Sequence, residues 1–189
     1  MSLTRKDIRT VARRSVKALE DYGHECCLFG SVACYLWGME NRDPNFYLVP
    51  GKSRHKRYHV LWYTLRRGVH CKVDIVTPNT TELNIPDIPL DTIDVIRNIP
   101  VMSFLPLLLL KLQGWDDHRN IDKTHMRAKI PQDKADLKEL LTMLDANDKL
   151  RKNKWLPSWF AKLARARVRE FVNKYPYKEE SWSYIGFHV

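Results

Sequence analysis

The sequence predicts an α+β protein, in which a small mixed β-sheet is followed by a lobe built from helices. Segments rich in aromatic and β-branched residues, which favour strands, lie in the first half of the 189-residue chain. A proline-punctuated connector over residues 84–89 follows them, and beyond it the apolar residues recur at helical spacing. We therefore expect two domains, an α+β core over residues 1–100 and a helical lobe over residues 101–189.

The core is expected to begin with a helix over residues 4–22, where apolar residues recur at helical spacing. Thr4 and Asp7 form a candidate capping box, and Gly23 is placed to end the helix. The outer face of this helix is basic and carries Arg5, Lys6, Arg9, Arg13, Arg14 and Lys17. Strands are expected over residues 26–29, 46–49, 58–65 and 69–76, the last two joined by the turn 66–68.

The helical lobe is expected to contain one deeply buried helix and two amphipathic ones. Residues 103–113 are apolar nearly all round, which indicates a helix buried on most sides. Helices over residues 133–144 and 158–175 each have one apolar face. The apolar face of the last helix comprises Phe160, Leu163, Val168, Phe171 and Val172. The polar segment 114–132 is expected to be a loop.

The composition limits the classes of partner and compartment. The net charge of +10 favours anionic partners such as nucleotides or RNA, because the field of a basic protein attracts polyanions. The four cysteines lack paired spacing, so we expect free thiols in a reducing compartment. The longest apolar run, residues 101–110, is shorter than the roughly 20 residues of a membrane span, and no signal peptide is seen. We expect a soluble intracellular protein, cytoplasmic or nuclear, with no membrane partner.

The first candidate site is the turn Leu28-Phe29-Gly30-Ser31, between a short predicted strand and a predicted helix. Glycine lets a phosphate approach the backbone closely, and the serine can cap the helix and donate a hydrogen bond. The free amide groups at a helix N-terminus carry partial positive charge, which favours anions. The same sequence is also compatible with an ordinary tight turn that binds nothing.

A second candidate is Asp74, which interrupts the apolar segment 71–76. A carboxylate in a buried strand requires a partner, because burying an unpaired charge is costly. Strand alternation points Lys72 and Asp74 to the same face, so an ion pair between them is one interpretation. The other is a Mg²⁺ ligand, since Mg²⁺ is held by carboxylates together with substrate phosphates.

Together, the Gly30-Ser31 turn and a later strand with an isolated aspartate resemble the nucleotidyltransferase fold of the DNA polymerase beta superfamily. More narrowly, the chain is similar to a group of fungal nucleotidyltransferase-like proteins. The similar stretches are residues 27–38 (CLFGSVACYLWG), 60–65 (VLWYTL), 71–78 (CKVDIVTP), 107–119 (LLLLKLQGWDDHR) and the terminal FVNKYP and SWSYIGF.

The resemblance implies a nucleotidyltransferase-like core and, in an intact relative, transfer of a nucleotidyl group from a nucleoside triphosphate to a hydroxyl. It implies that Gly30 and Ser31 bind the substrate phosphates. It also implies that Asp74 is a catalytic aspartate that binds Mg²⁺, and that Lys111, a charge within an apolar helix, meets the triphosphate. Two metal ions held by three aspartates are needed for this chemistry, because they activate the hydroxyl and neutralise the leaving pyrophosphate.

The chain departs from this pattern where two of the aspartates belong. Arg42-Asp43-Pro44-Asn45 runs directly into the predicted strand 46–49, so the strand with the aspartate pair is missing. Asp43 is a possible substitute metal ligand, but Pro44 cannot donate to a sheet and Asn45 is neutral. The strand 46–49 is the only nearby candidate to pair with residues 26–29 instead. The sequence therefore predicts a degenerate nucleotidyltransferase-fold protein that binds nucleotides weakly at most, and leaves open whether it is an enzyme.

Other polar residues of the helical lobe have two interpretations each. Asp116, Asp117 and His118 could bind a metal ion, or they end the buried helix and point to solvent. Lys129, Asp133 and Asp136 match a pattern of related helical lobes, or they cap a helix and form a surface pair.

Three alternatives to the degenerate protein remain open. One is an active Mg²⁺-dependent transferase that uses Asp43 or Asp116 in place of the missing pair. Another is a module without catalysis, whose basic first helix and Arg-rich segment 161–169 bind RNA or an acidic protein. The third is that the missing strand reflects an omitted exon.

Overall fold

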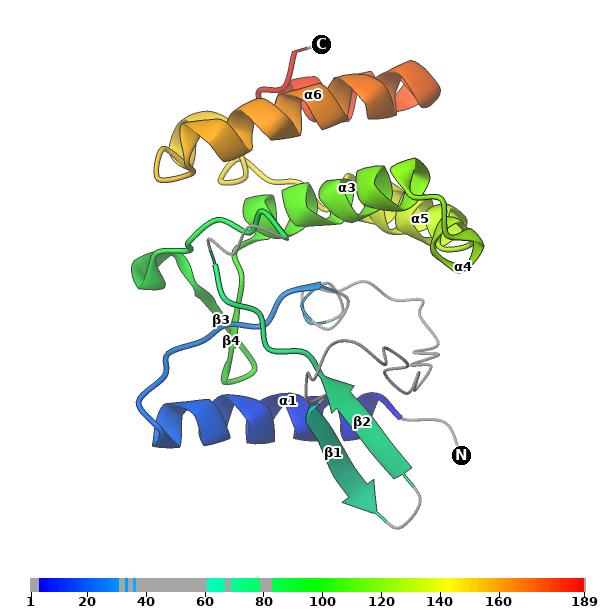
Figure 1. Cartoon of the computed structure of the whole chain (residues 1–189). Helices are drawn as coiled ribbons and strands as arrows, with labels where there is room; N and C mark the ends of the chain where they lie inside the picture. Colours follow the sequence, from blue (N-terminus) through cyan, green and yellow to red (C-terminus); the bar gives the residue numbers. More distant parts are fainter. Residues whose placement is uncertain are drawn as a thin grey trace.

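The fold is a mixture of helices and short strands, as the sequence predicts at this coarse level. The structure, a computed structural model, describes residues 4–30, 33, 36, 61–66, 69–78 and 83–188. Figure 1 shows α1 at one end of the molecule, α3 and α5 in the middle, and α6 with the C-terminus at the other end. Among the helices that the structure describes, none combines the length and the apolar composition needed to cross a membrane.

Helix α1 (Arg5–Asp21) forms as its sequence predicts. Thr4 and Asp7 make both hydrogen bonds of the capping box, and the chain turns away after the C-cap residue Tyr22 through Gly23, whose φ is +78°. The apolar side of α1 is buried through Ile8, Val11, Ala12 and Val16. This side contacts β1, β2 and β4, so α1 covers one face of the strands.

Two antiparallel hairpins supply the described strands. β1 (Leu61–Arg66) pairs with β2 (Val69–Val73), which confirms the predicted hairpin. The second hairpin joins β3 (Asp94–Ile96) to β4 (Ile99–Val101) and was not predicted. Its two turn residues, Arg97 and Asn98, have φ values of 54° and 58°, the left-handed conformation that tight hairpins require.

The predicted strand 26–29 is reduced to a single bridge. Leu28 pairs with Val101 of β4 in parallel, through hydrogen bonds to Pro100 and Met102. Because β3 joins the other side of β4 in antiparallel fashion, this small group of strands has mixed directions. One neighbour of residues 26–29 is therefore β4, which the sequence did not indicate. Residues 46–49 lie outside the described ranges, so their pairing with residues 26–29 stays a prediction.

The rest of the chain is mostly helical. The longer helices are α3 (Phe104–Asn120), α5 (Ile130–Leu140) and α6 (Ser158–Lys174). Shorter elements are η1 (Leu90–Thr92), α4 (Thr124–Arg127), η2 (Leu150–Lys152), η3 (Pro176–Lys178) and α7 (Glu179–Tyr184). The predicted loop 114–132 is wrong, because α3 continues to Asn120 and α4 and the start of α5 follow. The division into domains 1–100 and 101–189 stays a prediction.

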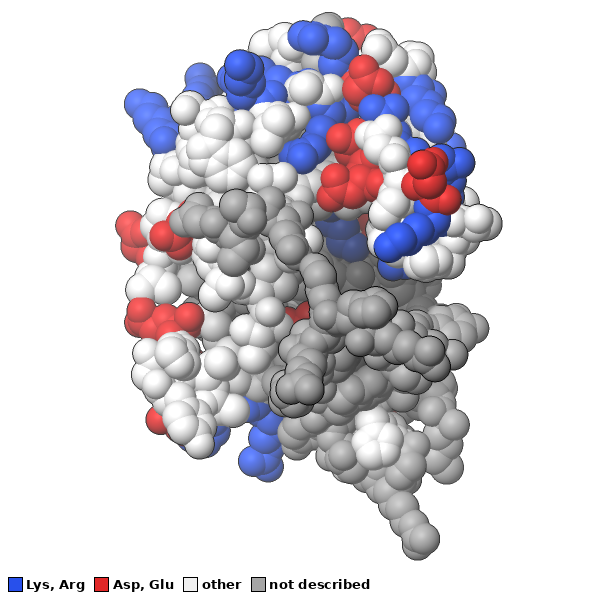
Figure 2. Space-filling view, viewed as in Figure 1, with Lys and Arg blue, Asp and Glu red and all other residues white. Residues whose placement is uncertain are grey.

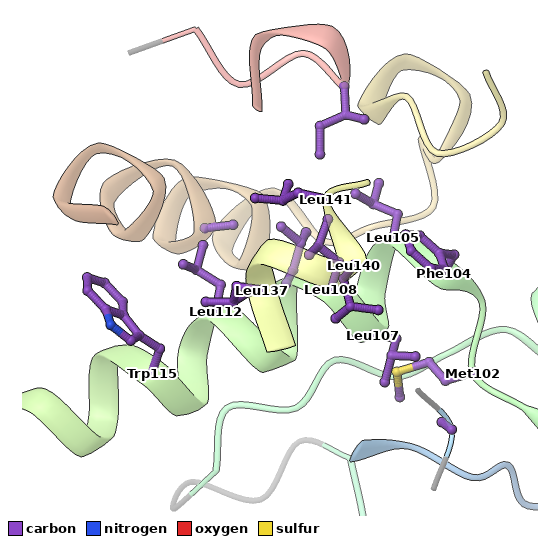
Figure 3. Close-up of a cluster of buried hydrophobic side chains, with 14 of the residues drawn as sticks. Met102, Phe104, Leu105, Leu107, Leu108, Leu112, Trp115, Leu137, Leu140 and Leu141 are labelled. Atoms are coloured by element: carbon purple, nitrogen blue, oxygen red, sulfur yellow. The ribbon is translucent and has the colours of Figure 1, made fainter. Parts of the chain in front are cut away.

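Helix α3 lies at the centre of the hydrophobic core, as its apolar sequence indicates. Figure 3 shows Leu107, Leu108 and Leu112 of α3 beside Leu137 and Leu140 of α5. On its other side α3 contacts α6, where Trp115 packs edge-on against Phe171 at a centroid distance of 5.0 Å. The predicted buried face of α6 is correct except for Leu163, which is 40% exposed.

Candidate functional site

The turn at Gly30 is held by backbone hydrogen bonds and has a glycine in the left-handed conformation. The N–H of Leu28 donates to the carbonyl of Pro100 at 2.9 Å, and the N–H of Met102 donates to the carbonyl of Leu28 at 2.8 Å. Two residues later Gly30 has a φ of +72° and begins a helical stretch that includes the buried Ala33 and Leu36. The bridge and the buried helical residues hold the turn from both sides.

Gly30 is required by this conformation, and the space beside it is open. A residue with a side chain is strained at a φ of +72°, whereas glycine is not. A Cβ atom at this position would meet no atom within 4 Å. Ser31, the second residue of the predicted cradle, lies outside the described residues, as do Asp43 and the junction 42–46.

Asp74 is placed differently from the sequence prediction. Strand β2 ends at Val73, so Asp74 follows the strand instead of lying inside it. Its side chain is exposed, and it takes part in at least one polar interaction. An exposed carboxylate keeps much of its hydration, so the argument that a buried charge demands an ion pair does not apply to it. The side chain of Lys72 is not among those that the structure describes.

Lys111 forms an ion pair inside the helical lobe. Its Nζ lies 2.9 Å from Oδ2 of Asp136, and the side chains are 14% and 1% exposed. The other carboxylate oxygen of Asp136 accepts a hydrogen bond from Nε2 of Gln132 at 2.9 Å. The expected surface role of Asp136 is therefore wrong, because this carboxylate is one of the most buried polar groups in the described chain. The counter-ion of Asp136 is Lys111, which the resemblance to nucleotidyltransferase-like proteins implies to contact the substrate triphosphate.

Asp116 and His118 are tied to the neighbouring helices, whereas Asp117 is exposed, as the interpretation that these residues point to solvent expects. Nδ1 of His118 lies 2.6 Å from Oδ2 of Asp133 on α5. Asp116 pairs with Arg119 at 2.8 Å and with Arg167 of α6 at 3.5 Å. Burial raises the pKa of Asp117, against the opposing effect of the nearby Arg167 charge. These contacts explain why a polar sequence continues α3, and they also exclude the predicted surface role for Asp133.

The described residues do not make a magnesium site. No group of three or more His, Cys, Asp or Glu side chains in the described ranges is arranged to hold a metal ion. Of the two carboxylates assigned to Mg²⁺, only Asp74 is described, and one protein carboxylate is a poor anchor for this ion without a bound phosphate. The magnesium site stays a prediction, because Asp43 lies outside the described residues.

Sequence reasoning missed a polar pocket of about 560 Å³ at the start of α3. Its walls include the carboxylates of Asp94, Asp145 and Asp148 together with the hydroxyl-bearing Ser103. Burial raises the pKa of Asp148, and the like charges of Asp145 and Asp94 act in the same direction, whereas a hydrogen bond from the backbone N–H of Asp145 opposes them. These residues come from separate segments, so no local motif could have indicated the pocket.

Thiol chemistry is unfavourable at the described cysteines. Cys26, Cys27 and Cys71 are free thiols, as predicted. Burial raises the pKa of Cys27 to about 11, with a further contribution from Cys26. A thiol with this pKa is almost fully protonated at neutral pH, and the thiolate is the nucleophile. A nucleophilic role for Cys27 is thereby disfavoured.

The candidate residues that the structure describes are thus the glycine turn, the exposed Asp74 after β2, and the paired charges of the helical lobe such as Lys111 and Asp136. Comparison with protein-family models, curated proteins and solved structures finds no match to this chain.

Proposed function

We propose that the chain is a nucleotidyltransferase-fold protein that has become degenerate and binds the phosphate groups of a nucleotide weakly at the Gly30 turn. The observation that carries this proposal is the left-handed Gly30, with a φ of +72°, which is assigned as helical and follows the bridged Leu28 by two residues. Backbone N–H groups at such a position attract phosphate without requiring a charged side chain. The resemblance of residues 27–38 to nucleotidyltransferase-like proteins supports the same assignment.

Two observations favour weak binding over efficient catalysis. The first is that the junction at residues 42–46, where the aspartate pair is missing, is a feature of the sequence itself. The charge of Lys111 is balanced by the buried Asp136, so it adds little net attraction for a triphosphate. Binding then rests on the backbone amides of the turn.

Calorimetric titration with ATP, with and without Mg²⁺, tests the proposal. We expect saturable binding with a Kd in the millimolar range, weakened at least severalfold by Gly30→Ala. Gly23→Ala is a matched control, because Gly23 has a similar φ of +78° and also has open space at its Cβ position. Both variants carry a similar backbone strain of about 1–2 kcal/mol, but only Gly30→Ala should lose affinity. No binding at millimolar ATP, or equal losses in the two variants, contradicts the proposal.

Active transfer is the first alternative. It predicts incorporation of label from an α-labelled nucleoside triphosphate into an acceptor, abolished by Asp74→Ala. Asp74 is exposed, so this substitution should leave the fold intact and any loss of activity can be assigned to the carboxylate.

Polyanion binding is the second candidate function, and one feature of the chain favours it. Residues 149–169 contain eight Lys and Arg residues and no Asp or Glu. A segment of this charge attracts polyanions such as RNA, with an affinity that falls steeply as salt rises. This function requires neither Gly30 nor Asp74, so it can hold whether or not the chain binds nucleotides.

A further inference from the structure

We propose that the exposed face of α6 binds single-stranded nucleic acid, with Trp159 as the stacking platform and Lys162, Arg165 and Arg169 as the phosphate contacts. The proposal rests on the polyanion-binding function above and assigns it to one surface. It is independent of nucleotide binding at Gly30.

The geometry of the helix divides this face into two adjacent stripes. At 100° per residue, Lys162, Arg165 and Arg169 fall within about 60° of one another around the axis. Trp159, Leu163 and Ala166 fall within a similar arc of about 60° beside them. All six residues are exposed, whereas Phe160, Ala164, Val168 and Phe171 on the opposite side are buried against α3 and the C-terminal segment. A cationic stripe therefore runs alongside an apolar one.

Trp159 is held in place although it is exposed. It is 40% exposed, and its ring packs against Phe160 with a centroid distance of 5.6 Å and an interplanar angle of 76°. Phe160 is fully buried, so it fixes the position of its neighbour. An exposed aromatic ring that is already ordered loses little conformational freedom when a base stacks on it.

The cations of this face are available to a ligand. Among the described residues, Lys162, Arg165 and Arg169 make no ion pair, whereas Arg167 points inward and lies 3.5 Å from Asp116. The one acidic residue on the face, Glu170, pairs with Arg119 of α3 at 3.1 Å. Figure 2 shows Lys and Arg side chains gathered along the end of the molecule where α6 lies in Figure 1.

The spacing of these cations suits an extended phosphate backbone. Lys162 and Arg169 are separated by seven residues, which is about 10 Å along the helix axis. Arg165 lies between them on the same stripe. Three cations in a row beside an aromatic ring can follow a strand whose bases turn toward the ring, which is the arrangement that single-strand binding proteins use.

Single-stranded nucleic acid fits this surface better than the other anionic partners. A membrane would require a larger apolar face, and here only Trp159 and Leu163 are large exposed apolar side chains, each 40% exposed. An acidic peptide would use the charges but has no need of a stacking ring. Helix α1 is also basic but contains no aromatic residue, so it offers charge without a platform for bases.

Fluorescence anisotropy with a labelled 20-nucleotide oligouridine tests the assignment. Changing Lys162, Arg165 and Arg169 together to Gln should weaken binding at least tenfold. The same variant should lower the slope of log affinity against log salt by about 2, since each single-strand phosphate contact contributes about 0.7. Trp159→Ala should weaken binding about tenfold, and Trp159→Phe should retain most of the affinity because it keeps an aromatic face. Circular dichroism checks that each variant is folded.

A variant of α1 with Lys6, Arg9 and Arg14 changed to Gln removes the same charge from another surface, and should change the affinity less than threefold. Equal losses in the α1 and α6 variants, or no effect of Trp159→Ala, overturn the α6 assignment but leave polyanion binding in place. Tighter binding to vesicles containing phosphatidylserine, or to poly-glutamate, than to the oligonucleotide also overturns it. Absence of salt-sensitive binding overturns the assignment and the polyanion function together, while the Gly30 proposal stands or falls by ATP titration alone.

Discussion

The helical lobe and the N-terminal half of the chain differ in how deeply they bury their side chains. Within the described ranges, the largest fully buried side chains all belong to residues 99–187, and they include Trp115, Phe171 and Trp182. The N-terminal half contributes smaller side chains such as Val11 and Ala12. Buried apolar area stabilises a fold, so among the described residues the helical lobe contributes most. The Gly30 turn and Asp74 lie where the described side chains are less deeply buried, and we expect local opening to be less costly there.

The two regions also differ in how they use charge. In the helical lobe, polar groups of α3 are paired internally with α5 and α6, as in the pairs Lys111–Asp136 and Arg119–Glu170. On α1, Lys6, Arg9 and Arg14 make no ion pair with described residues. The pairs of α3 therefore belong to the architecture of the lobe, whereas these surface cations of α1 have no ionic partner among the described residues.

The largest effect is expected from truncating the core of the helical lobe. Phe171 is fully buried and packs on Trp115, Tyr175 and Trp182. Phe171→Ala should lower the free energy of unfolding by about 3–5 kcal/mol, because it removes apolar area and leaves a cavity. Urea denaturation followed by far-UV circular dichroism measures this loss.

The matched test in the N-terminal half is Ile8→Val, compared with Ile185→Val in the lobe. Each removes one methylene, and the side chains are 8% and 0% exposed. We expect both losses to lie within about 0.5–1.5 kcal/mol, with the larger one at Ile185. A larger loss at Ile8 would mean that the N-terminal half, and not the helical lobe, packs its side chains more tightly.

Breaking the buried ion pair should have the largest effect after Phe171→Ala, and a larger one than either Ile→Val change. Asp136→Asn leaves the Lys111 ammonium beside a neutral group at a site where the acid is 1% exposed. The free energy of unfolding should fall by about 3 kcal/mol, because the charge of Lys111 then loses its buried counter-ion Asp136. In a double-mutant cycle, Lys111→Met with Asp136→Leu should cost much less than the sum of the two single changes, since no charge is then left unpaired. Additive losses would show that the pair is not coupled.

The pocket at the start of α3 predicts a pH effect opposite to that of ordinary salt-bridged carboxylates. Burial raises the pKa of Asp148 above its ordinary value of 3.8, so the folded chain keeps this proton to higher pH than the unfolded chain. The contribution of Asp148 to stability is therefore present below pH 3.8 and is lost as the pH rises through the folded-state pKa.

An asparagine side chain does not titrate, so Asp148→Asn should remove this loss of stability. The change in the free energy of unfolding from pH 3.5 to pH 7 should therefore be more favourable in the variant than in the parent chain. The amide oxygen can still accept the hydrogen bond from the backbone N–H of Asp145, which is 2.7 Å long in the parent. Thermal melts from pH 3.5 to 7 measure the difference. An unchanged pH profile would show that Asp148 does not titrate in this way.

The smallest expected effect is a gain in stability at Gly114. This glycine lies within α3, and a Cβ atom there would meet no atom within 4 Å. Gly114→Ala should raise the free energy of unfolding by about 0.5–1 kcal/mol, because alanine loses less conformational entropy in a helix. Gly186→Ala, at a φ of +100°, should instead destabilise the chain. A loss of stability at Gly114 would mean that α3 needs glycine for another reason.

Local signals in the sequence predicted local structure well. The Thr4–Asp7 capping box and the hairpin turn at 66–68 act over three or four residues, so the sequence contains everything that determines them. The β3–β4 hairpin was missed because its strands have three residues each and its turn lacks glycine. The end of α3 was missed because Asp116 and His118 are stabilised by partners on α5 and α6 that are distant in sequence.

In the candidate site, too, the sequence predicted local structure but not the contacts between distant segments. The left-handed Gly30 could be predicted from its own neighbours, since a glycine between a strand and a helix indicates such a turn. The exposed position of Asp74 and the pairing of Lys111 with Asp136 could not, because they depend on where β2 ends and on how α3 packs against α5.

Hydrogen exchange with and without ATP tests the central claim most directly, because it reads both regions in one experiment. Without nucleotide, we expect amide protection to be highest in α3 and α6 and lower in α1 and the β1–β2 hairpin. Added ATP at millimolar concentration should increase protection around Gly30 and leave α3 and α6 nearly unchanged. Protection that increases in α3 at Lys111 but not at Gly30, or no change anywhere, would contradict nucleotide binding at the glycine turn.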